Sequence, residues 1–213
     1  MTPRFWRKKC TTKQLHYLPK SINTNVFKPD NTTQKKWDII SVGRLVPNYK
    51  NYDELGELSN TFRVCLVGNG PLLSSLQKKY PNMHFAGNVP NHLIPAYISQ
   101  SNVFFHSGKR DFNPRVITEA MACGVPPVAF NSIIKEDVIP TNCGYLIPEK
   151  DLNLTFNEIL TDQKKVDYYG KNARLHILNE RSRTSSLQIL EHTIGKVISP
   201  THPVQTLVSQ LPM

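Results

Sequence analysis

Two carboxylates, Asp111 and Glu119, lie eight positions apart around the expected start of a short helix. Pro114 suits the first helical position, because its φ is fixed and the N–H that it lacks would have no partner there. Gly124 suits the end of the helix, which leaves Glu119 inside it beside two alanines. An unpaired carboxylate is costly to bury among small side chains, so a polar partner is expected. Ligand hydroxyls are one such partner, because an ionised carboxylate is an acceptor with room for two donors.

Two basic residues follow an earlier apolar run. Arg44 comes directly after the run 38–43, and Lys50 lies six positions further on. The planar guanidinium of arginine suits bidentate phosphate binding, and lysine adds a compact charge on a flexible stem. Together they can neutralise a diphosphate. The alternative is a surface ion pair for Arg44 and a solvated lysine at a helix start for Lys50.

Short apolar runs alternate with helical patterns from residue 37 to residue 147. The expected strands are 38–43, 62–67, 83–86, 102–106, 126–130 and 144–147, with helices at 52–59, 71–79, 91–99 and between Pro114 and Gly124. This alternation predicts an α/β fold with one doubly wound parallel sheet and right-handed crossovers. After Asp151 the pattern is helical only, and it predicts extra C-terminal helices at 152–160, 163–178 and 184–197.

The candidate site residues fall where expected strands end. Arg44 follows the first strand, Gly68 and Gly70 the second, Val89 the third and Asp111 the fourth. In open parallel sheets, ligands bind beyond the carboxyl ends of the strands, where the strand order reverses. The clustering therefore predicts one binding site at this edge of the sheet.

Four blocks of the chain resemble, in the same order, blocks of the retaining glycosyltransferases with the GT-B fold, of the family-4 type. They are Ser-Val-Gly-Arg-Leu at 41–45 with Lys50, Leu-Val-Gly-Asn-Gly-Pro-Leu at 66–72, the acidic stretch ending in Ala-Met-Ala-Cys-Gly at 120–124, and Lys-Asn-Ala-Arg at 171–174. The resemblance runs from about residue 17 to residue 197. It implies the C-terminal, Rossmann-like half of such an enzyme, which binds a nucleotide-diphosphate sugar for hexose transfer with retention.

The resemblance also implies roles for single residues. Glu119 is expected at the ribose hydroxyls and Asp111 at hydroxyls of the donor sugar, although this family usually has Glu at the first acid. Arg44 and Lys50 are expected to hold the diphosphate and, with Asp111, to carry the catalysis. The alternative for Glu119 is an acid that the helix dipole favours.

Backbone amides at the start of the acidic helix are expected to hold the diphosphate too, because a helix N-terminus presents free N–H groups to an anion. Pro114 cannot donate, which leaves Arg115 and Val116; the Arg115 side chain is equally explained as surface charge. The resemblance places Val89 near the nucleobase. Gly68-Asn-Gly70 lacks the third glycine of a dinucleotide fingerprint, and a turn with positive φ explains it without a ligand.

No cofactor and no metal are expected. Histidines and cysteines show no ligand spacing, and the cations at 44 and 50 would replace a metal. The four cysteines, Cys10, Cys65, Cys123 and Cys143, are interpreted as reduced residues of a cytoplasmic protein.

The net charge of +10 is concentrated at the start of the chain. Residues 1–36 hold nine Lys or Arg and one acid, so the remainder is close to neutral. We interpret 1–36 as a basic arm or linker, 37–198 as the nucleotide-sugar-binding domain and 199–213 as a disordered tail. The arm is either a solvated segment or a contact to an anionic membrane surface; nucleic acid is not expected, because the domain shows no aromatic platform and no basic helix.

The chain has no room for the N-terminal, acceptor-binding half that the resemblance implies. That half would come from a partner chain or from a homodimer. The main hypothesis is therefore a glycosyltransferase domain, and the alternatives are a non-catalytic nucleotide-sugar-binding fragment and a surface adaptor driven by the arm. The sequence does not distinguish a UDP donor from a GDP donor.

Overall fold

A six-stranded sheet with the order β3-β2-β1-β4-β5-β6 forms the centre of the computed structural model, which describes residues 18, 20–30, 32–111 and 113–198. The strands are β1 Trp37–Val42, β2 Val64–Val67, β3 His84–Gly87, β4 Ser101–His106, β5 Pro127–Phe130 and β6 Tyr145–Ile147. Every ladder in the sheet is parallel. The predicted α/β class with one doubly wound parallel sheet is confirmed.

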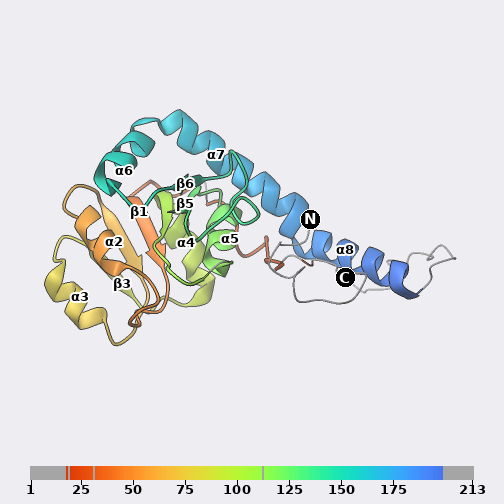
Figure 1. The fold of residues 1–213 in the computed structure, drawn as a ribbon, viewed down its shortest axis with the longest axis horizontal. Coiled ribbons are helices and arrows are strands. Elements are labelled where there is room, and N and C mark those ends of the chain that lie inside the picture. Colours follow the sequence, from red (N-terminus) through yellow and green to blue (C-terminus); the bar gives the residue numbers. More distant parts are fainter. Residues whose placement is uncertain (1–17, 19, 31, 112, 199–213) are drawn as a thin grey trace.

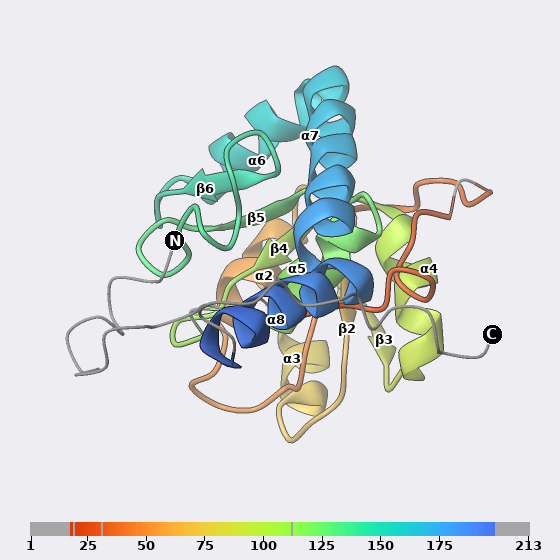
Figure 2. The same ribbon diagram turned by 90° about the vertical axis from the view of Figure 1, so that its right-hand side faces the viewer.

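Helices connect the strands and continue after the last one (Figure 1). They are α2 Tyr52–Leu58, α3 Leu73–Lys79, the 3₁₀ turn η1 Asn91–Leu93, α4 Ile94–Ser99, α5 Arg115–Ala122, α6 Leu152–Thr161, α7 Gln163–His176, the π turn η2 Ile177–Arg181 and α8 Arg183–Ile198. Figure 2 shows α7 and α8 meeting at an angle on one side of the sheet. The predicted elements are all present, with ends shifted by a few residues.

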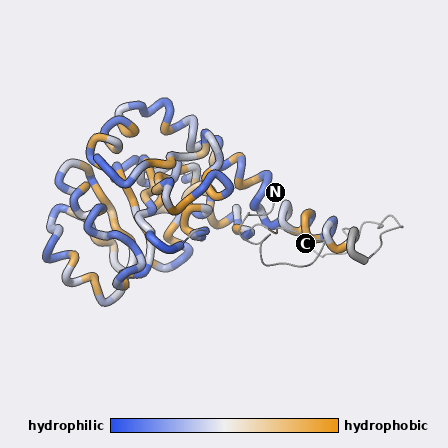
Figure 3. Tube along the Cα trace, viewed as in Figure 1, coloured by the Kyte–Doolittle hydropathy of each residue, from blue (hydrophilic) through white to orange (hydrophobic). Residues whose placement is uncertain are grey.

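Alternate residues of each strand enter two separate cores, one on each face of the sheet. Ile40 and Phe104 pack with α4, α5 and α7, whereas Ile39 and Phe105 pack with α2, α3 and α6. In Figure 3 the strands are accordingly hydrophobic. This pattern is typical of parallel strands that are buried on both faces.

Three predicted helix ends are corrected by the structure. Pro114 is the N-cap and not the first helical residue, because its ψ of 128° is extended and the helix begins at Arg115. The helix predicted at 91–99 starts as a 3₁₀ turn, since Pro95 has no N–H for the Asn91 carbonyl and the Ile94 N–H takes that acceptor. The helix predicted at 163–178 ends at His176 and continues as the π turn η2. Gly124, with a φ of +71°, ends α5 as predicted.

Part of the predicted basic arm packs against the domain. Ile22 and Phe27 are buried in the core on the α5 and α7 side, and the Ile22 N–H donates to the Arg181 carbonyl. The Arg174 guanidinium donates at 2.8 Å to the carbonyls of both Phe27 and Ala122, which ties this segment to α5 and α7. Residues 1–17, with Cys10, and the predicted tail 199–213 lie outside the described residues.

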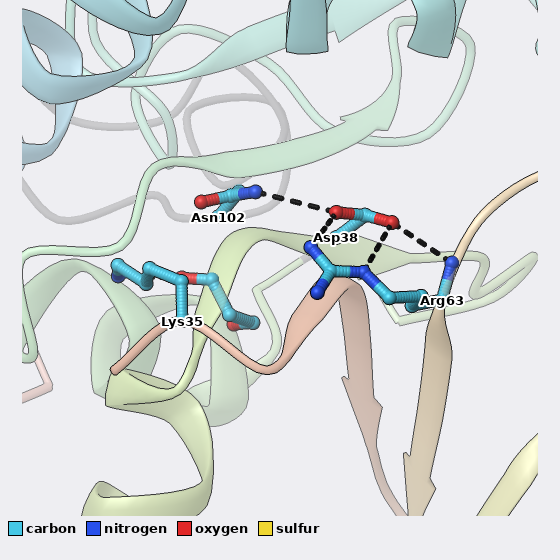
Figure 4. Close-up of polar contacts among 5 residues, drawn as sticks. Lys35, Asp38, Arg63 and Asn102 are labelled. Carbon is cyan, nitrogen blue, oxygen red and sulfur yellow. Dashed lines mark hydrogen bonds and ion pairs between the residues drawn. The ribbon is translucent and has the colours of Figure 1, made fainter. Parts of the chain in front are cut away.

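A polar network joins the amino ends of the central strands (Figure 4). The Arg63 guanidinium donates to both carboxylate oxygens of Asp38, at 3.1 and 2.6 Å, and the Asn102 amide reaches the same carboxylate. The ammonium of Lys35 donates to the carbonyls of Ser99 and Ser101. These contacts hold the end of the sheet that lies opposite the expected binding site.

Helix α8 extends away from the sheet and its covering helices (Figure 1). Leu187, Leu190 and Ile194 on it are exposed to between 38 and 55%. Their spacing of three and four places them on one face of the helix, so α8 carries an apolar stripe that the described residues do not cover.

The turn after β1 is held by the glycines that follow β2. A Cβ atom at Gly68 would overlap the carbonyl oxygen of Gly43, and one at Gly70 would overlap that of Leu45. The Leu45 N–H also donates to the Asn69 carbonyl at 3.0 Å. The Gly68-Asn-Gly70 pattern thus has a packing reason that needs no ligand, and it fixes the backbone on either side of Arg44.

We predict that Gly68→Ala destabilises the fold more than Gly87→Ala. Both glycines have positive φ, at +149° and +68°, but only Gly68 faces backbone at close range. Positive φ costs an alanine about 1–2 kcal/mol, and overpacking adds about 1–3 kcal/mol at position 68 alone. Urea denaturation of the two variants measures this, and equal unfolding free energies would contradict the packing of the β2 loop on the β1 turn.

Candidate functional site

The strand order reverses between β1 and β4, so the loops that follow these two strands leave the sheet at a topological switch point. The loop after β1 carries Arg44 and Lys50, and the loop after β4 carries Asp111. The two loops pair with each other through an isolated antiparallel bridge between Lys50 and Gly108. The structure therefore brings together residues that are about 60 positions apart in the chain.

Two backbone hydrogen bonds strengthen this pairing. The Asn51 N–H donates to the Ser107 carbonyl at 2.9 Å, and the Lys109 N–H donates to the Tyr49 carbonyl at 3.4 Å. The loops consequently form a short two-stranded extension beyond the end of the sheet.

Lys50 lies inside this pairing with only 7% of its surface exposed. Its ammonium donates to the Val42 carbonyl at 2.6 Å, and a Cβ at Gly43 would lie 2.9 Å from its Nζ. The alternative of a solvated lysine is therefore wrong. Burial lowers the pKa of Lys50 to about 8, although the Asp111 charge opposes the shift. The ammonium remains mostly charged at pH 7.

Burial and the nearby Lys50 charge also lower the pKa of His106, the last residue of β4. Both ring nitrogens are buried and have no hydrogen-bond partner among the residues that the structure describes, and the pKa of His106 is lowered to about 3. His106 is therefore neutral at physiological pH. It therefore supplies no charge to the site.

Asp111 is half-buried, and both oxygens of its carboxylate have protein partners. The Tyr49 hydroxyl donates to Oδ2 at 3.1 Å, and the Asn113 N–H donates to Oδ1 at 3.3 Å. Sequence reasoning missed Tyr49, for which the only available signal is its position beside Lys50.

The Arg44 side chain is exposed on the loop after β1. Burial and the Asp111 charge raise the pKa of Tyr49, whereas the Arg44 charge opposes this rise, so all three side chains interact. The Tyr52 hydroxyl donates to the Arg44 carbonyl and fixes the turn. The structure thus brings the loop that carries Arg44 and Lys50 against the loop that carries Asp111, and the Tyr49 hydroxyl joins the two loops.

The start of α5 follows directly on this cluster. Its first residues, Arg115 and Val116, have N–H groups that no carbonyl within the helix can accept. The Lys20 ammonium donates to the Asn113 carbonyl at 2.8 Å, a contact with the N-terminal segment that sequence reasoning missed. The cluster therefore ends in a helix N-terminus that favours an anion.

Glu119 faces a different depression, a cavity of about 310 Å³. It is lined by Ser21, Ile22, Asn23, Val26, Phe27, Asn91, Arg115, Glu119 and Arg183. Burial raises the pKa of Glu119, and the Arg115 charge opposes the shift. Arg115 lies one turn earlier on the same face of α5, so this helix connects the cavity to the Asp111 loop.

Val89 does not line this cavity. It is half-buried and packs against the core, whereas Asn91, two residues further on, reaches the cavity wall. Sequence reasoning also missed the wall contributed by residues 21–27. Only their contact with α5, about 90 positions later in the chain, places them there.

Among the described residues no group of three or more His, Cys, Asp or Glu is arranged to hold a metal ion. Cys65, Cys123 and Cys143 are free and buried. None of the described helices is both long enough and apolar enough to cross a bilayer. The loops at the switch point offer two cations and a helix N-terminus for an anion and Asp111 for hydroxyl groups, and the separate cavity offers Glu119 for hydroxyl groups.

Comparison with curated proteins identifies a relative of known activity. A GDP-mannose-dependent alpha-mannosyltransferase of Mycobacterium tuberculosis is 29% identical over 183 residues, which cover 80% of this chain and 44% of that protein. The chain therefore spans about half the length of this relative.

Solved structures share the fold at low sequence identity. Sucrose-phosphate synthase from Thermosynechococcus elongatus matches with a TM-score of 0.74 at 21% identity, over 92% of this chain and 56% of that chain. The C-terminal domain of a glycosyl transferase group 1 family protein from Francisella tularensis matches with a TM-score of 0.63 at 16% identity, over 76% of this chain and 100% of that domain. The sheet and its helices thus correspond to one Rossmann-like half of the GT-B fold.

The family itself follows from the sequence. The model of the family described as glycosyl transferases group 1 matches residues 23–176, which include every strand, the Lys50–Gly108 bridge and helix α5. The chain belongs to the glycosyl transferases group 1 family.

Proposed function

We propose that this chain is the donor-binding half of a glycosyltransferase that transfers a hexose from a nucleotide-diphosphate sugar with retention at the anomeric carbon. One observation carries the proposal. The bridge between Lys50 and Gly108 gathers two cations, an acid and a helix N-terminus at the switch point of the sheet. Family membership supports the same activity.

The diphosphate would lie between Arg44, Lys50 and the amides of Arg115 and Val116. The Lys50 ammonium gives one of its three donors to Val42, which leaves donors for phosphate oxygens. As the sugar leaves, negative charge grows on the diphosphate, and pre-arranged cations and amides stabilise it. This arrangement needs no metal.

The rest of the donor would lie on either side of the diphosphate. Glu119, in its cavity, is suited to accept hydrogen bonds from the two ribose hydroxyls, and Asn91 joins Val89 as a contact for the base. Asp111, beside the cations, is suited to hydroxyls of the sugar. The mycobacterial relative is GDP-mannose-dependent, so GDP-mannose is the first donor to test and UDP-glucose the second.

The acceptor half would come from another chain or from elsewhere in a longer protein. The chain spans 44% of the mycobacterial relative, and the apolar stripe Leu187, Leu190 and Ile194 on α8 is uncovered by the described residues. An exposed stripe of this kind supports packing against a further domain. A contact of the basic arm, residues 1–36, with an anionic membrane is a further proposal, which vesicle binding of the full chain tests.

We predict that the full chain binds GDP-mannose or UDP-glucose and that Arg44→Ala and Glu119→Ala each weaken this binding by about tenfold or more. Each change removes charge-assisted hydrogen bonds worth about 1.5–3 kcal/mol. Isothermal titration calorimetry measures the affinities. Lys78→Ala, which removes an exposed cation from α3, is the control and should bind like the wild type. Wild-type affinity in the Arg44 variant would contradict the diphosphate site.

We predict that donor affinity falls by about tenfold between pH 7 and pH 9. The pKa of Lys50 in the free protein is about 8, so the ammonium that binds phosphate loses its proton across this range. The diphosphate of a nucleotide sugar keeps its charge over the same range. The control variant Lys50→Met has no titrating group at position 50. The variant should therefore bind weakly, with a smaller pH dependence. Parallel pH profiles for both proteins would contradict the role of Lys50.

We predict that sugar transfer requires an acceptor half. Mixing this chain with the N-terminal half of the mycobacterial relative should give transfer from GDP-mannose, whereas neither half alone should. The anomeric configuration of the product, measured by NMR, tests retention. Donor binding without transfer under every pairing would favour the alternative, a non-catalytic nucleotide-sugar-binding fragment.

A further inference from the structure

Tyr49 occupies a position in the site that no role assigned so far explains. Its hydroxyl donates to Asp111 Oδ2 at 3.1 Å, across 62 positions of the chain, and its ring is half-buried. Its carbonyl accepts the Lys109 N–H, so the backbone at Tyr49 is paired with the loop that carries Asp111. Both the backbone and the side chain of Tyr49 therefore contact this loop.

The Asp111 carboxylate needs hydrogen-bond donors that fix its orientation. It is a short side chain whose charge acts on the Lys50 ammonium, yet none of the ion pairs within 4.0 Å among the described residues joins it to Lys50 or Arg44. Tyr49 holds Oδ2 and the Asn113 N–H holds Oδ1, one donor on each oxygen. Because each carboxylate oxygen has two acceptor positions, the described residues leave one position open on each oxygen. The carboxylate is thus oriented without being saturated.

We propose that Tyr49 is a positioning residue that orients the Asp111 carboxylate toward hydroxyls of the donor sugar. This inference rests on the proposed function and deepens it at the sugar end of the site. The phenol hydroxyl gives Asp111 one defined orientation, so that its free acceptor positions are in place before the donor binds. Tyr49 acts through Asp111 and does not contact the diphosphate, which Arg44 and Lys50 bind.

Tyr49→Phe tests the proposal, because it removes one hydroxyl and keeps the ring. The affinities of the full chain for GDP and GDP-mannose, and for UDP and UDP-glucose, are measured by calorimetry. We expect the ratio of nucleotide-sugar affinity to nucleotide affinity to fall by about threefold to tenfold, the range of a single hydrogen bond. A merely structural role would weaken both ligands of a pair equally and leave the ratio unchanged, which would overturn the proposal.

Two further variants sharpen this test. Tyr80→Phe removes a matched bond, from the Tyr80 hydroxyl to Asp53 Oδ1 at 2.6 Å, and should leave the ratio unchanged. In an Asp111→Ala background, Tyr49→Phe should have no further effect, because its target is gone. An equal effect of Tyr49→Phe in both backgrounds would overturn the proposal and leave the donor site intact. A wild-type chain that binds none of the four ligands would overturn the donor site as well.

Discussion

The backbone bridge between Lys50 and Gly108 is the interaction on which the site depends. It joins the loops after β1 and β4 at the point where the strand order reverses. The connections that follow these two strands run to opposite sides of the sheet, which leaves a crevice open between the two loops. The bridge buries the Lys50 ammonium beneath Gly43 and brings Asp111 beside it. The pairing therefore holds the loop that carries the cation against the loop that carries the acid.

A second constraint links the site to the N-terminal segment. The Arg174 guanidinium donates to carbonyls of residues 24, 27 and 122, so one side chain of α7 joins this segment to the end of α5. The same segment forms a wall of the cavity at Glu119. Residues 20–30 therefore contribute to the packing of the domain and to the proposed nucleoside site. The interpretation of residues 1–36 as an arm did not include either contribution.

Much of the fold could be predicted from the sequence, because the apolar periodicities and the glycine and proline positions are local signals. Each strand from 38–43 to 144–147 is found close to its predicted place, and Gly124 ends α5 as expected. The errors fall where a single backbone group decides the end of a helix. The extended ψ of Pro114 delays α5 by one residue, and the N–H that Pro95 lacks converts the start of the helix at 91–99 into a 3₁₀ turn.

The sequence by itself determined the order of strands and helices, the family and the chemical types of the candidate site residues. These follow from short patterns, and the carboxyl ends of parallel strands must lie at one edge of a sheet. Only the tertiary structure decided which atoms meet. The burial of Lys50, the Tyr49–Asp111 hydrogen bond and the separate cavity of Glu119 depend on distances between segments far apart in the chain, set by loop pairing and side-chain packing that no local pattern encodes.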